Sequence, residues 1–432
     1  MRWIGIIACA TLAACGDDQA VQPDPVAIEV ASYAAVPTNK FDVLFMIDNT
    51  TEIDMELSLA ADIGPLLATL GALPGGLDLH LGVTSSDLGT SGSDDRDAPG
   101  ITLGSCKGKG DDGALLVVSQ MVTGSYLVDT ADGSGRNYTG ELAAAVKAMI
   151  PTGSSGCGFE QSIAATSRAF DNPQNAGFLR EDANLLIVML SDEDDCSVKN
   201  GSLFGPASDM LGSRQSYRCT RFGVVCDEPI DIPGEKTNCH SNETSDLLDP
   251  VAPYVEHIRS VKSDPARVGV FAMSGPPTPF AIELRTPPGS TAAPEPALAD
   301  SCHFEEPFGP AVADPAVRLN EFARGFGANG GFGESCVADF APRVQDMVTL
   351  VNRMEGVICL GATTRSCSVH VDTGASTPAR DVPLCGAAGD DCFEIIADAA
   401  ACPDSLDNAR LVVHLANPTP DEYVRASCSA PN

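Results

Sequence analysis

Residues 40–54, KFDVLFMIDNTTEID, contain an unbroken apolar run from Phe41 to Ile47 that ends in a cluster of polar residues. Seven residues is about the length of a β-strand, and apolar side chains at both odd and even positions indicate that both faces are buried. Strands of this kind occur in parallel sheets that are covered by helices. The segment therefore predicts a central strand of an α/β sheet, with oxygen-bearing side chains at its carboxyl end.

Several later segments predict the neighbours of this strand. Residues 77–89 begin as a second strand, and ANLLIVMLSDEDDCS at 183–197 is another buried strand that ends in acidic residues. Between the first two strands, residues 52–71 predict one amphipathic helix, whose expected buried stripe is Ile53, Leu57, Ala60, Ile63, Leu67 and Leu70. Strand, helix and strand within about fifty residues form a βαβ unit. We therefore expect a doubly wound, mostly parallel sheet.

The N-terminal segment MRWIGIIACATLAAC is similar to a bacterial lipoprotein signal peptide. It has one basic residue, Arg2, and an apolar run too short to span a bilayer as a mature helix. The resemblance implies cleavage before Cys15, a lipid on the Cys15 sulfur and an acyl group such as palmitate on the new amino terminus. Gly16 after the lipidated cysteine favours the outer membrane. An ordinary signal peptide cut nearby is the alternative, and both interpretations predict export.

Cysteine usage and charge also favour an exported binding protein. Of sixteen cysteines, Cys9 and Cys15 belong to the signal region, and the even remainder of fourteen predicts seven disulfides. No C-x-x-C pair is present, so a zinc site is not predicted. The net charge of −33 argues against nucleic acid as a partner and is compatible with divalent cations.

The composition divides the chain into four parts. They are a signal peptide at 1–14, a lipid anchor and linker at 15–38, the α/β domain at 39–358 and a small disulfide-rich β module at 359–432. The α/β domain is expected to carry disulfide-stapled insertions near 90–113, 198–249 and 275–312, the last of them Pro-rich and irregular. Eight cysteines lie in the α/β domain and six in the C-terminal module, so each part can pair its own cysteines.

The order of motifs resembles a von Willebrand factor A (vWA) domain over about residues 38–358. The features that carry the resemblance are Asp-x-Thr-x-Glu after the first strand, an amphipathic helix, a second strand and a distant strand that ends in Ser-Asp. Lipoprotein members of the family have GCGFEQ and DEDDCS at equivalent places. The resemblance implies a metal-ion-dependent adhesion site, in which Mg²⁺ or a similar ion is bound and a ligand carboxylate completes its coordination.

The resemblance also implies which residues hold the ion. Asp48 and Thr50 match the first aspartate and first serine of the family's D-x-S-x-S motif, and Glu52 lies where the second serine belongs. The complete predicted set is Asp48, Thr50, Glu52, Glu160 and Asp192. Glu160 stands for the loop threonine of the family, and Gln161 and Ser155 are alternatives for that place.

These departures from the family pattern shape the expected function. Two carboxylates in place of hydroxyls add negative charge around the ion, which favours Ca²⁺ and reduces the need for a ligand carboxylate. We expect a membrane-anchored lipoprotein that binds an extracellular protein or other ligand with a divalent cation, and no enzymatic activity. One alternative is a structural or interaction protein of the cell envelope without metal. The other is a metal-dependent hydrolase, although the chain has no H-E-x-x-H and no G-x-S-x-G.

Overall fold

The structure is a computed structural model that describes residues 27–50, 53–94, 102–286, 291, 293–306, 309–361, 366–373, 379–386 and 389–429. The predicted signal peptide and two predicted site residues, Cys15 and Glu52, lie outside the described residues. Within the described ranges, no helix is long and apolar enough to cross a membrane.

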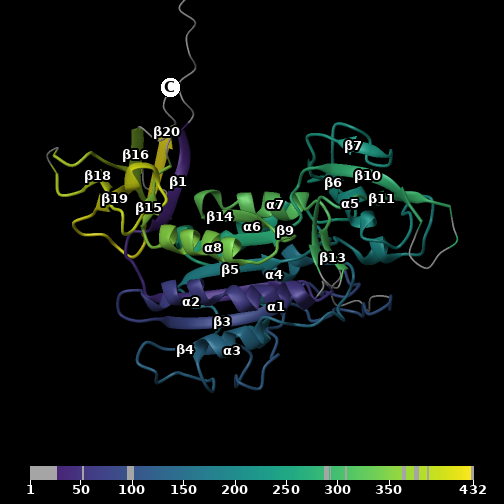
Figure 1. Cartoon of the computed structure of the whole chain (residues 1–432), viewed down its shortest axis with the longest axis horizontal. Helices are drawn as coiled ribbons and strands as arrows, with labels where there is room; N and C mark the ends of the chain where they lie inside the picture. The colour runs from purple at the N-terminus through teal and green to yellow at the C-terminus, as the bar shows by residue number, and fades with distance from the viewer. Residues whose placement is uncertain are drawn as a thin grey trace, which may run out of the picture.

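A six-stranded sheet forms the centre of the molecule (Figure 1). Its strands, in spatial order, are β14 (Gly330–Glu334), β9 (Val268–Ser274), β5 (Asn184–Leu190), β2 (Lys40–Ile47), β3 (Asp78–Ser85) and β4 (Leu127–Asp129). All neighbours pair in parallel except β3 and β4, which are antiparallel. The predicted α/β class, the mostly parallel sheet and the central place of residues 40–47 are confirmed.

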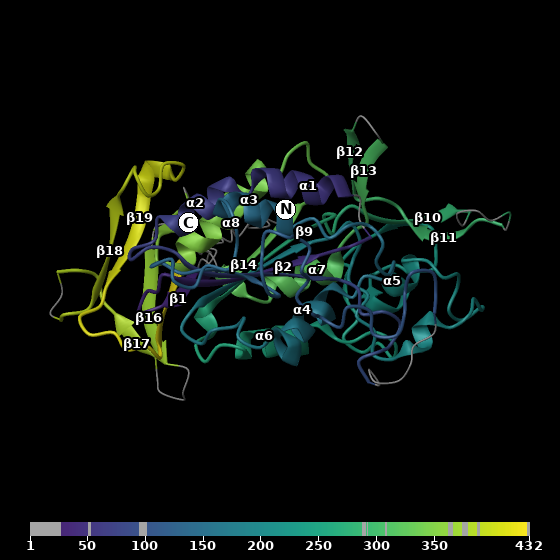
Figure 2. The ribbon, with the colours of Figure 1, turned by 90° about the horizontal axis from the view of Figure 1, so that it is seen from below.

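Helices cover both faces of this sheet (Figure 2). One layer contains α1 (Ile53–Asp62), α2 (Gly64–Gly71), α3 (Leu142–Met149) and α8 (Ala341–Met354). The other contains α4 (Ser162–Asp171), α6 (Val251–Ser260) and α7 (Val317–Arg324). Phe45 of β2 packs in the first layer and Met46 in the second, because successive strand residues point to opposite faces.

The single helix predicted over 52–71 is wrong in one respect, because the chain forms two helices that meet at Ile63. Pro65 lies in the first turn of α2, where its missing N–H costs no hydrogen bond. Ile53 and Leu57 of the predicted buried stripe are 43 % and 49 % exposed, whereas Leu59 is fully buried. The break changes the helical phase, so the stripe predicted from one continuous helix fails before Ala60.

The C-terminal module recruits a strand from the other end of the chain. Its strands are β15 (Ile358–Cys359), β16 (Ser366–Thr373), β17 (Arg380–Val382), β18 (Cys392–Ala397), β19 (Ala409–His414) and β20 (Glu422–Ser429). Residues 27–34, which we expected to be linker, form β1 (Ala27–Ala34), an edge strand antiparallel to β20. This part of the prediction for 15–38 is wrong because Ala31 is fully buried in the module core, against a partner that local patterning does not reveal.

The insertions form a lobe at the opposite end of the molecule from the C-terminal module (Figures 1 and 2). Its elements are α5 (Tyr217–Gly223), β6 (Val224–Val225), β7 (Gly234–Lys236), β8 (His240–Ser241), β10 (Phe280–Arg285) and β11 (Glu295–Leu298). A hairpin of β12 (Cys302–Glu306) and β13 (Gly309–Ala313) follows. The irregular structure expected for 275–312 is therefore wrong, because β10 pairs with β11 on one side and with the distant β7 on the other.

All fourteen cysteines outside the signal region are paired, as the cysteine count predicted. The bonds are Cys106–Cys157, Cys196–Cys219, Cys226–Cys239, Cys302–Cys336, Cys359–Cys402, Cys367–Cys428 and Cys385–Cys392. Four bonds lie before residue 359 and three after it, so no disulfide joins the α/β domain to the C-terminal module.

Candidate functional site

The candidate site lies where the strand order of the sheet reverses. From β2 the chain first builds β3 and β4 on one side, and then β5, β9 and β14 on the other. Ligands bind beyond the carboxyl ends of strands at such a switch point. The ladder continues past the strands, since Asp48 N donates to Leu190 O (2.9 Å) and Ser191 N donates to Met273 O (3.0 Å). Asp48 and the acidic run after β5 are therefore held side by side.

Asp48 is fully buried and both of its carboxylate oxygens have hydroxyl partners. The Thr50 backbone N–H and hydroxyl lie 2.9 and 2.8 Å from Oδ1, and the Ser191 hydroxyl donates to Oδ2 at 2.7 Å. The carboxyl of Asp192 lies within hydrogen-bonding reach of the Asp48 carboxyl. The structure thus brings three predicted residues together, Asp48, Thr50 and Asp192, and adds Ser191.

Glu160 reaches the same place from the loop before α4. Its carbonyl accepts from Cys196 N (2.7 Å), and the following residue, Gln161, donates its N–H to Ser86 O (3.1 Å). The Glu160 side chain is 1 % exposed, its Oε1 lies 2.5 Å from the Thr50 hydroxyl, and its Oε2 is buried without a hydrogen-bond partner. A hydroxyl has one proton, so Thr50 can donate to only one of Asp48 and Glu160 at a time.

The two alternatives to Glu160 lie elsewhere. Ser155 is exposed to solvent. The amide of Gln161 bridges other loops, donating to Gly89 O (3.2 Å) and accepting from Val198 N (3.3 Å). Among the three candidates for this place, the structure brings only Glu160 against Thr50.

Glu193 is a member of the cluster that sequence reasoning missed. Its backbone is held by two serines, since Glu193 N donates to Ser191 Oγ (3.2 Å) and Ser274 Oγ donates to Glu193 O (3.2 Å). Its carboxyl lies within hydrogen-bonding reach of the Glu160 carboxyl. The available signal was the position of Glu193 directly after Asp192 in the DEDD run.

The other two acids of DEDD position the surrounding helices. Asp194 accepts from the backbone N–H groups of Arg318 (3.0 Å) and Leu319 (3.1 Å) at the start of α7. Asp195 accepts from Ile163 N (2.9 Å) at the start of α4 and pairs with the buried Arg318 guanidinium at 3.0 Å. Since a carboxylate at a helix N-terminus satisfies free N–H groups, these two acids lock the acidic loop to both helices.

A buried glutamate of α1 positions the loop on the opposite side. The carboxylate of Glu56 accepts from Thr152 N (2.7 Å), Gly153 N (3.2 Å) and the Thr152 hydroxyl (3.0 Å). Burial raises the pKa of Glu56, and the Asp48 carboxylate raises it further. Glu56 therefore holds the 151–156 loop near the cluster without belonging to it.

Burial raises the pKa of every carboxyl in the cluster, and repulsion between carboxylates raises those of Glu160, Asp192 and Glu193 further. The pKa of Glu160 rises to about 8, and that of Asp192 to about 9, through burial first and then the negative charge of Asp48. The pKa of Asp48 is also raised by burial, and that of Glu193 lies well above its ordinary value through burial and the Glu160 charge. Next to them, burial and Asp300 raise the pKa of Asp314 to about 7.

Asp48 and Glu160 are buried and Asp192 and Glu193 are half-buried, and among the described residues no basic side chain pairs with any of the four. Asp42, at the opposite end of β2, pairs with Lys262 (3.0 Å) and Arg180 (2.8 Å). In the part of the chain that the structure describes, the charged groups acting on Asp48, Glu160, Asp192 and Glu193 are other carboxyls. Four neighbouring acids without a basic partner are suited to bind a cation, because hard divalent cations prefer oxygen ligands.

One other group of side chains has metal-ligand spacing. Within the described residues, Cys385, Glu394 and His414 are the only acidic, histidine or cysteine trio whose ligand atoms lie within 4.8 Å of one another. Cys385 is bonded to Cys392, so its sulfur is not a free thiolate. This trio is therefore not a metal centre of the oxidised chain.

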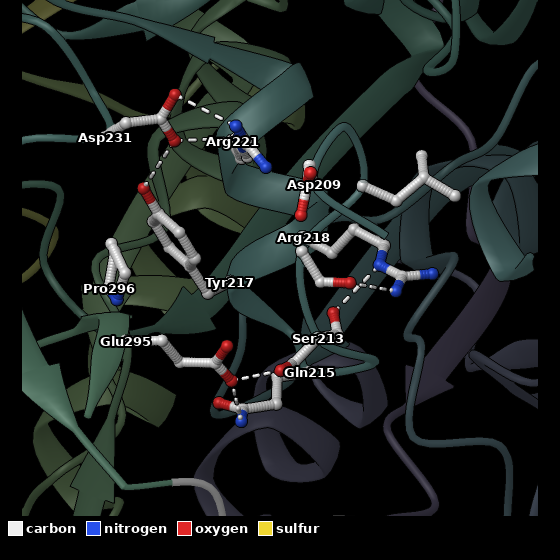
Figure 3. A pocket seen from close by; sticks show the side chains of 11 residues that line it. Asp209, Ser213, Gln215, Tyr217, Arg218, Arg221, Asp231, Glu295 and Pro296 are labelled. Carbon is white, nitrogen blue, oxygen red and sulfur yellow. Dashed lines mark hydrogen bonds and ion pairs between the residues drawn. The ribbon is translucent and has the colours of Figure 1, made fainter. Parts of the chain in front are cut away.

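A cavity of about 260 Å³ lies in the insertion lobe, beside α5 and β11 (Figure 3). Several of its polar wall residues contact one another. Arg221 pairs with Asp231 at 2.7 Å, and Gln215 donates to Glu295 at 3.1 Å. Tyr217 closes the wall by donating its hydroxyl to Ile230 O at 2.8 Å. The cavity shares no residue with the strand-end carboxyls and forms a separate feature of the lobe.

Comparisons with known proteins found no matching protein-family model and no matching curated protein. One solved structure with some likeness is the pilus adhesin RrgA of Streptococcus pneumoniae, with 9 % identity and a TM-score of 0.31 over 94 % of this chain and 58 % of that chain. Another is the adhesive tip pilin of Group B Streptococcus agalactiae, with 9 % identity and a TM-score of 0.30 over 94 % of this chain and 82 % of that chain. The open form of the pilus adhesin SpaC of Lactobacillus rhamnosus GG has 7 % identity and a TM-score of 0.29 over 92 % of this chain and 39 % of that chain. The chain thus spans little more than half the length of the RrgA chain. Function is therefore argued from the site itself.

Proposed function

We propose that this chain is an exported lipoprotein that is anchored through Cys15, in the outer membrane, and whose vWA-like domain binds a divalent cation. Asp48, Thr50, Glu160 and Asp192 hold Mg²⁺ or Ca²⁺, and the cation-bound site mediates adhesion-type binding of an extracellular protein or other ligand. When bound, the cation supplies the positive charge that the cluster lacks.

The observation that carries the proposal is that Glu160 Oε2 is buried and has no hydrogen-bond partner. A buried carboxylate oxygen without a partner costs free energy, and the cost grows when the carboxyls of Glu193 and Asp48 lie beside it. Hydroxyl and carboxylate oxygens are the donors that Mg²⁺ and Ca²⁺ take. A cation at this place would satisfy Glu160 and offset the repulsion that raises the pKa values of the cluster.

Calorimetry of the purified full chain tests cation binding. We expect Ca²⁺ or Mg²⁺ to bind with measurable heat, and Asp48→Ala to remove that heat because it deletes the carboxylate at the centre of the cluster. The matched control is Asp246→Ala, since Asp246 is an exposed aspartate of the insertion lobe. Asp48→Ala with undiminished cation heat would overturn the metal assignment.

The second candidate function is cation-independent contact through the insertion lobe. Large apolar side chains exposed on the lobe include Met210 (73 %), Ile232 (57 %) and Leu284 (58 %). Pull-down experiments in Ca²⁺ and in EDTA separate the two functions, because a partner retained equally in both binds without the metal. A phosphoesterase assay that stays at background addresses the hydrolase alternative.

A further inference from the structure

The four carboxyls are arranged as two pairs and not as one cage. Asp48 and Asp192 form one pair, in reach of each other and of the Thr50 and Ser191 hydroxyls. Glu160 and Glu193 form the second. Among the described residues, no three of these carboxyls offer ligand atoms that all lie within 4.8 Å of one another. An ion held by three or four of them would have to draw these carboxyls closer together, whereas each pair already offers two carboxyls to one ion.

The two pairs adjoin through one hydroxyl. Thr50 Oγ1 lies 2.8 Å from Asp48 Oδ1 in the first pair and 2.5 Å from Glu160 Oε1 in the second. The partnerless Oε2 of Glu160 belongs to the second pair, so the unsatisfied oxygen lies outside the Asp48 pair to which the family motif assigns the ion. Ser191 and Ser274 fix the backbone of Glu193 and so hold its carboxyl beside Glu160, where none of the described basic side chains pairs with it.

The charge of the cluster points the same way. Four ionised carboxylates carry four negative charges, and one divalent cation would leave two of these charges uncompensated in a cluster that is at least half-buried. Asp314 adds a further acid next to Glu193. Uncompensated buried charges are costly, and Arg285, the base that acts on Asp314, is already paired with Glu283. Two divalent cations would balance the four carboxylates.

We infer that the site binds two adjacent divalent cations, one at the Asp48–Asp192 pair and a second at the Glu160–Glu193 pair, with Thr50 between them. This inference rests on the proposed function and extends it, because the second position depends on Glu193. Asp314 lies beside that second position.

The test is the number of cations bound per purified full chain. It uses titration calorimetry with Ca²⁺ and elemental analysis after gel filtration, in about 0.15 M salt so that weak surface binding is screened. We expect two tightly bound cations in the wild type. One cation would overturn this inference and leave the proposed function standing, whereas none would overturn both.

Glu193→Gln gives the matched variant. It removes the charge of the second pair and keeps the shape of the side chain, and we expect one cation to remain. Glu256→Gln, at an exposed position of α6, should leave two. Because Glu193→Gln relieves repulsion, the cation-free variant should unfold no earlier than the wild type. Retention of two cations by Glu193→Gln would remove Glu193 from the second position.

Mn²⁺ provides a readout that does not depend on any variant. Two adjacent Mn²⁺ ions couple magnetically, so the wild type loaded with Mn²⁺ should show a spin-coupled electron paramagnetic resonance spectrum. Two uncoupled Mn²⁺ signals would show that the second cation binds elsewhere on this acidic chain, and would contradict the inference.

Discussion

Raising the pH from about 5 to about 8 in the presence of EDTA is expected to lower the free energy of unfolding through the strand-end carboxyls. Burial and mutual repulsion raise the folded-state pKa of Glu160 to about 8 and that of Asp192 to about 9. In the unfolded chain the pKa values of these groups are about 4. The folded chain therefore holds more protons over this pH range.

The sign of the effect follows from that difference. A carboxyl with a raised folded-state pKa stabilises the fold fully below its unfolded pKa, and this stabilisation is lost as the pH rises towards the folded value. The expected slope is about 1.4 kcal/mol per pH unit for each extra proton that the folded chain holds. Divalent cations should reverse the loss, because they bind the ionised carboxylates, and a cation at 100 times its Kd adds about 2.7 kcal/mol.

Urea unfolding as a function of pH, in EDTA and in excess Ca²⁺, measures this effect. Other buried acids also have raised pKa values, namely Asp194, Asp264, Asp314 and Glu355. The diagnostic quantity is therefore the difference between the wild type and Glu160→Gln, whose amide can donate to Thr50 as the protonated acid does. Glu160→Gln should flatten the slope, and Glu256→Gln should not. Equal slopes in the wild type and Glu160→Gln would show that Glu160 titrates near its ordinary pKa.

Arg318→Met should destabilise the folded chain by about 3 to 5 kcal/mol. Arg318 is fully buried, and its guanidinium donates to Asp195 (3.0 Å), to Asp249 O (2.8 Å) and to Ser241 Oγ (3.1 Å). Removing it leaves the Asp195 charge buried without a base. Because Asp195 also binds the start of α4, the loop that carries Asp192 and Glu193 should loosen, and cation affinity should fall as well.

Denaturant unfolding with the disulfides intact measures the loss. Arg324→Met is the matched control, since Arg324 is an exposed arginine in the same helix, and its effect should stay within about 0.5 kcal/mol. Adding Asp195→Asn to Arg318→Met should recover part of the stability, because the unpaired charge is then removed. If Arg318→Met has the same free energy of unfolding as the wild type, the buried Arg318–Asp195 pair does not stabilise the acidic loop.

Much of the sheet could be predicted because it depends on local pattern. The apolar run at 41–47 became β2 with both faces buried, and the runs near 77–89 and 183–197 became β3 and β5. The prediction of one helix over residues 52–71 was wrong in part, since a break at Ile63 changes which side chains face the core. The strands within 275–312 were not predicted, because β10 pairs with β7, a strand from another insertion.

The site shows the same division. Asp48 and Asp192 were found because each ends a buried strand, and parallel strands bring their carboxyl ends to one edge. Glu193 was missed because position in a run of acids does not reveal which side chain turns inward. That direction comes from Ser191 and Ser274, which hold the Glu193 backbone from the ends of two strands.

By itself, the sequence determined the buried central strand and the acidic ends of β2 and β5, because hydrophobic period and strand ends are local properties. It also determined that each part of the chain has an even number of cysteines to pair, because cysteines can be counted. Only the tertiary structure decided that residues 27–34 complete the C-terminal sheet, that Glu160 and Glu193 meet, and that Asp194 and Asp195 hold α7 and α4. These contacts join segments far apart in the chain, and their free energy comes from burial and pairing that exist only after the sheet has formed.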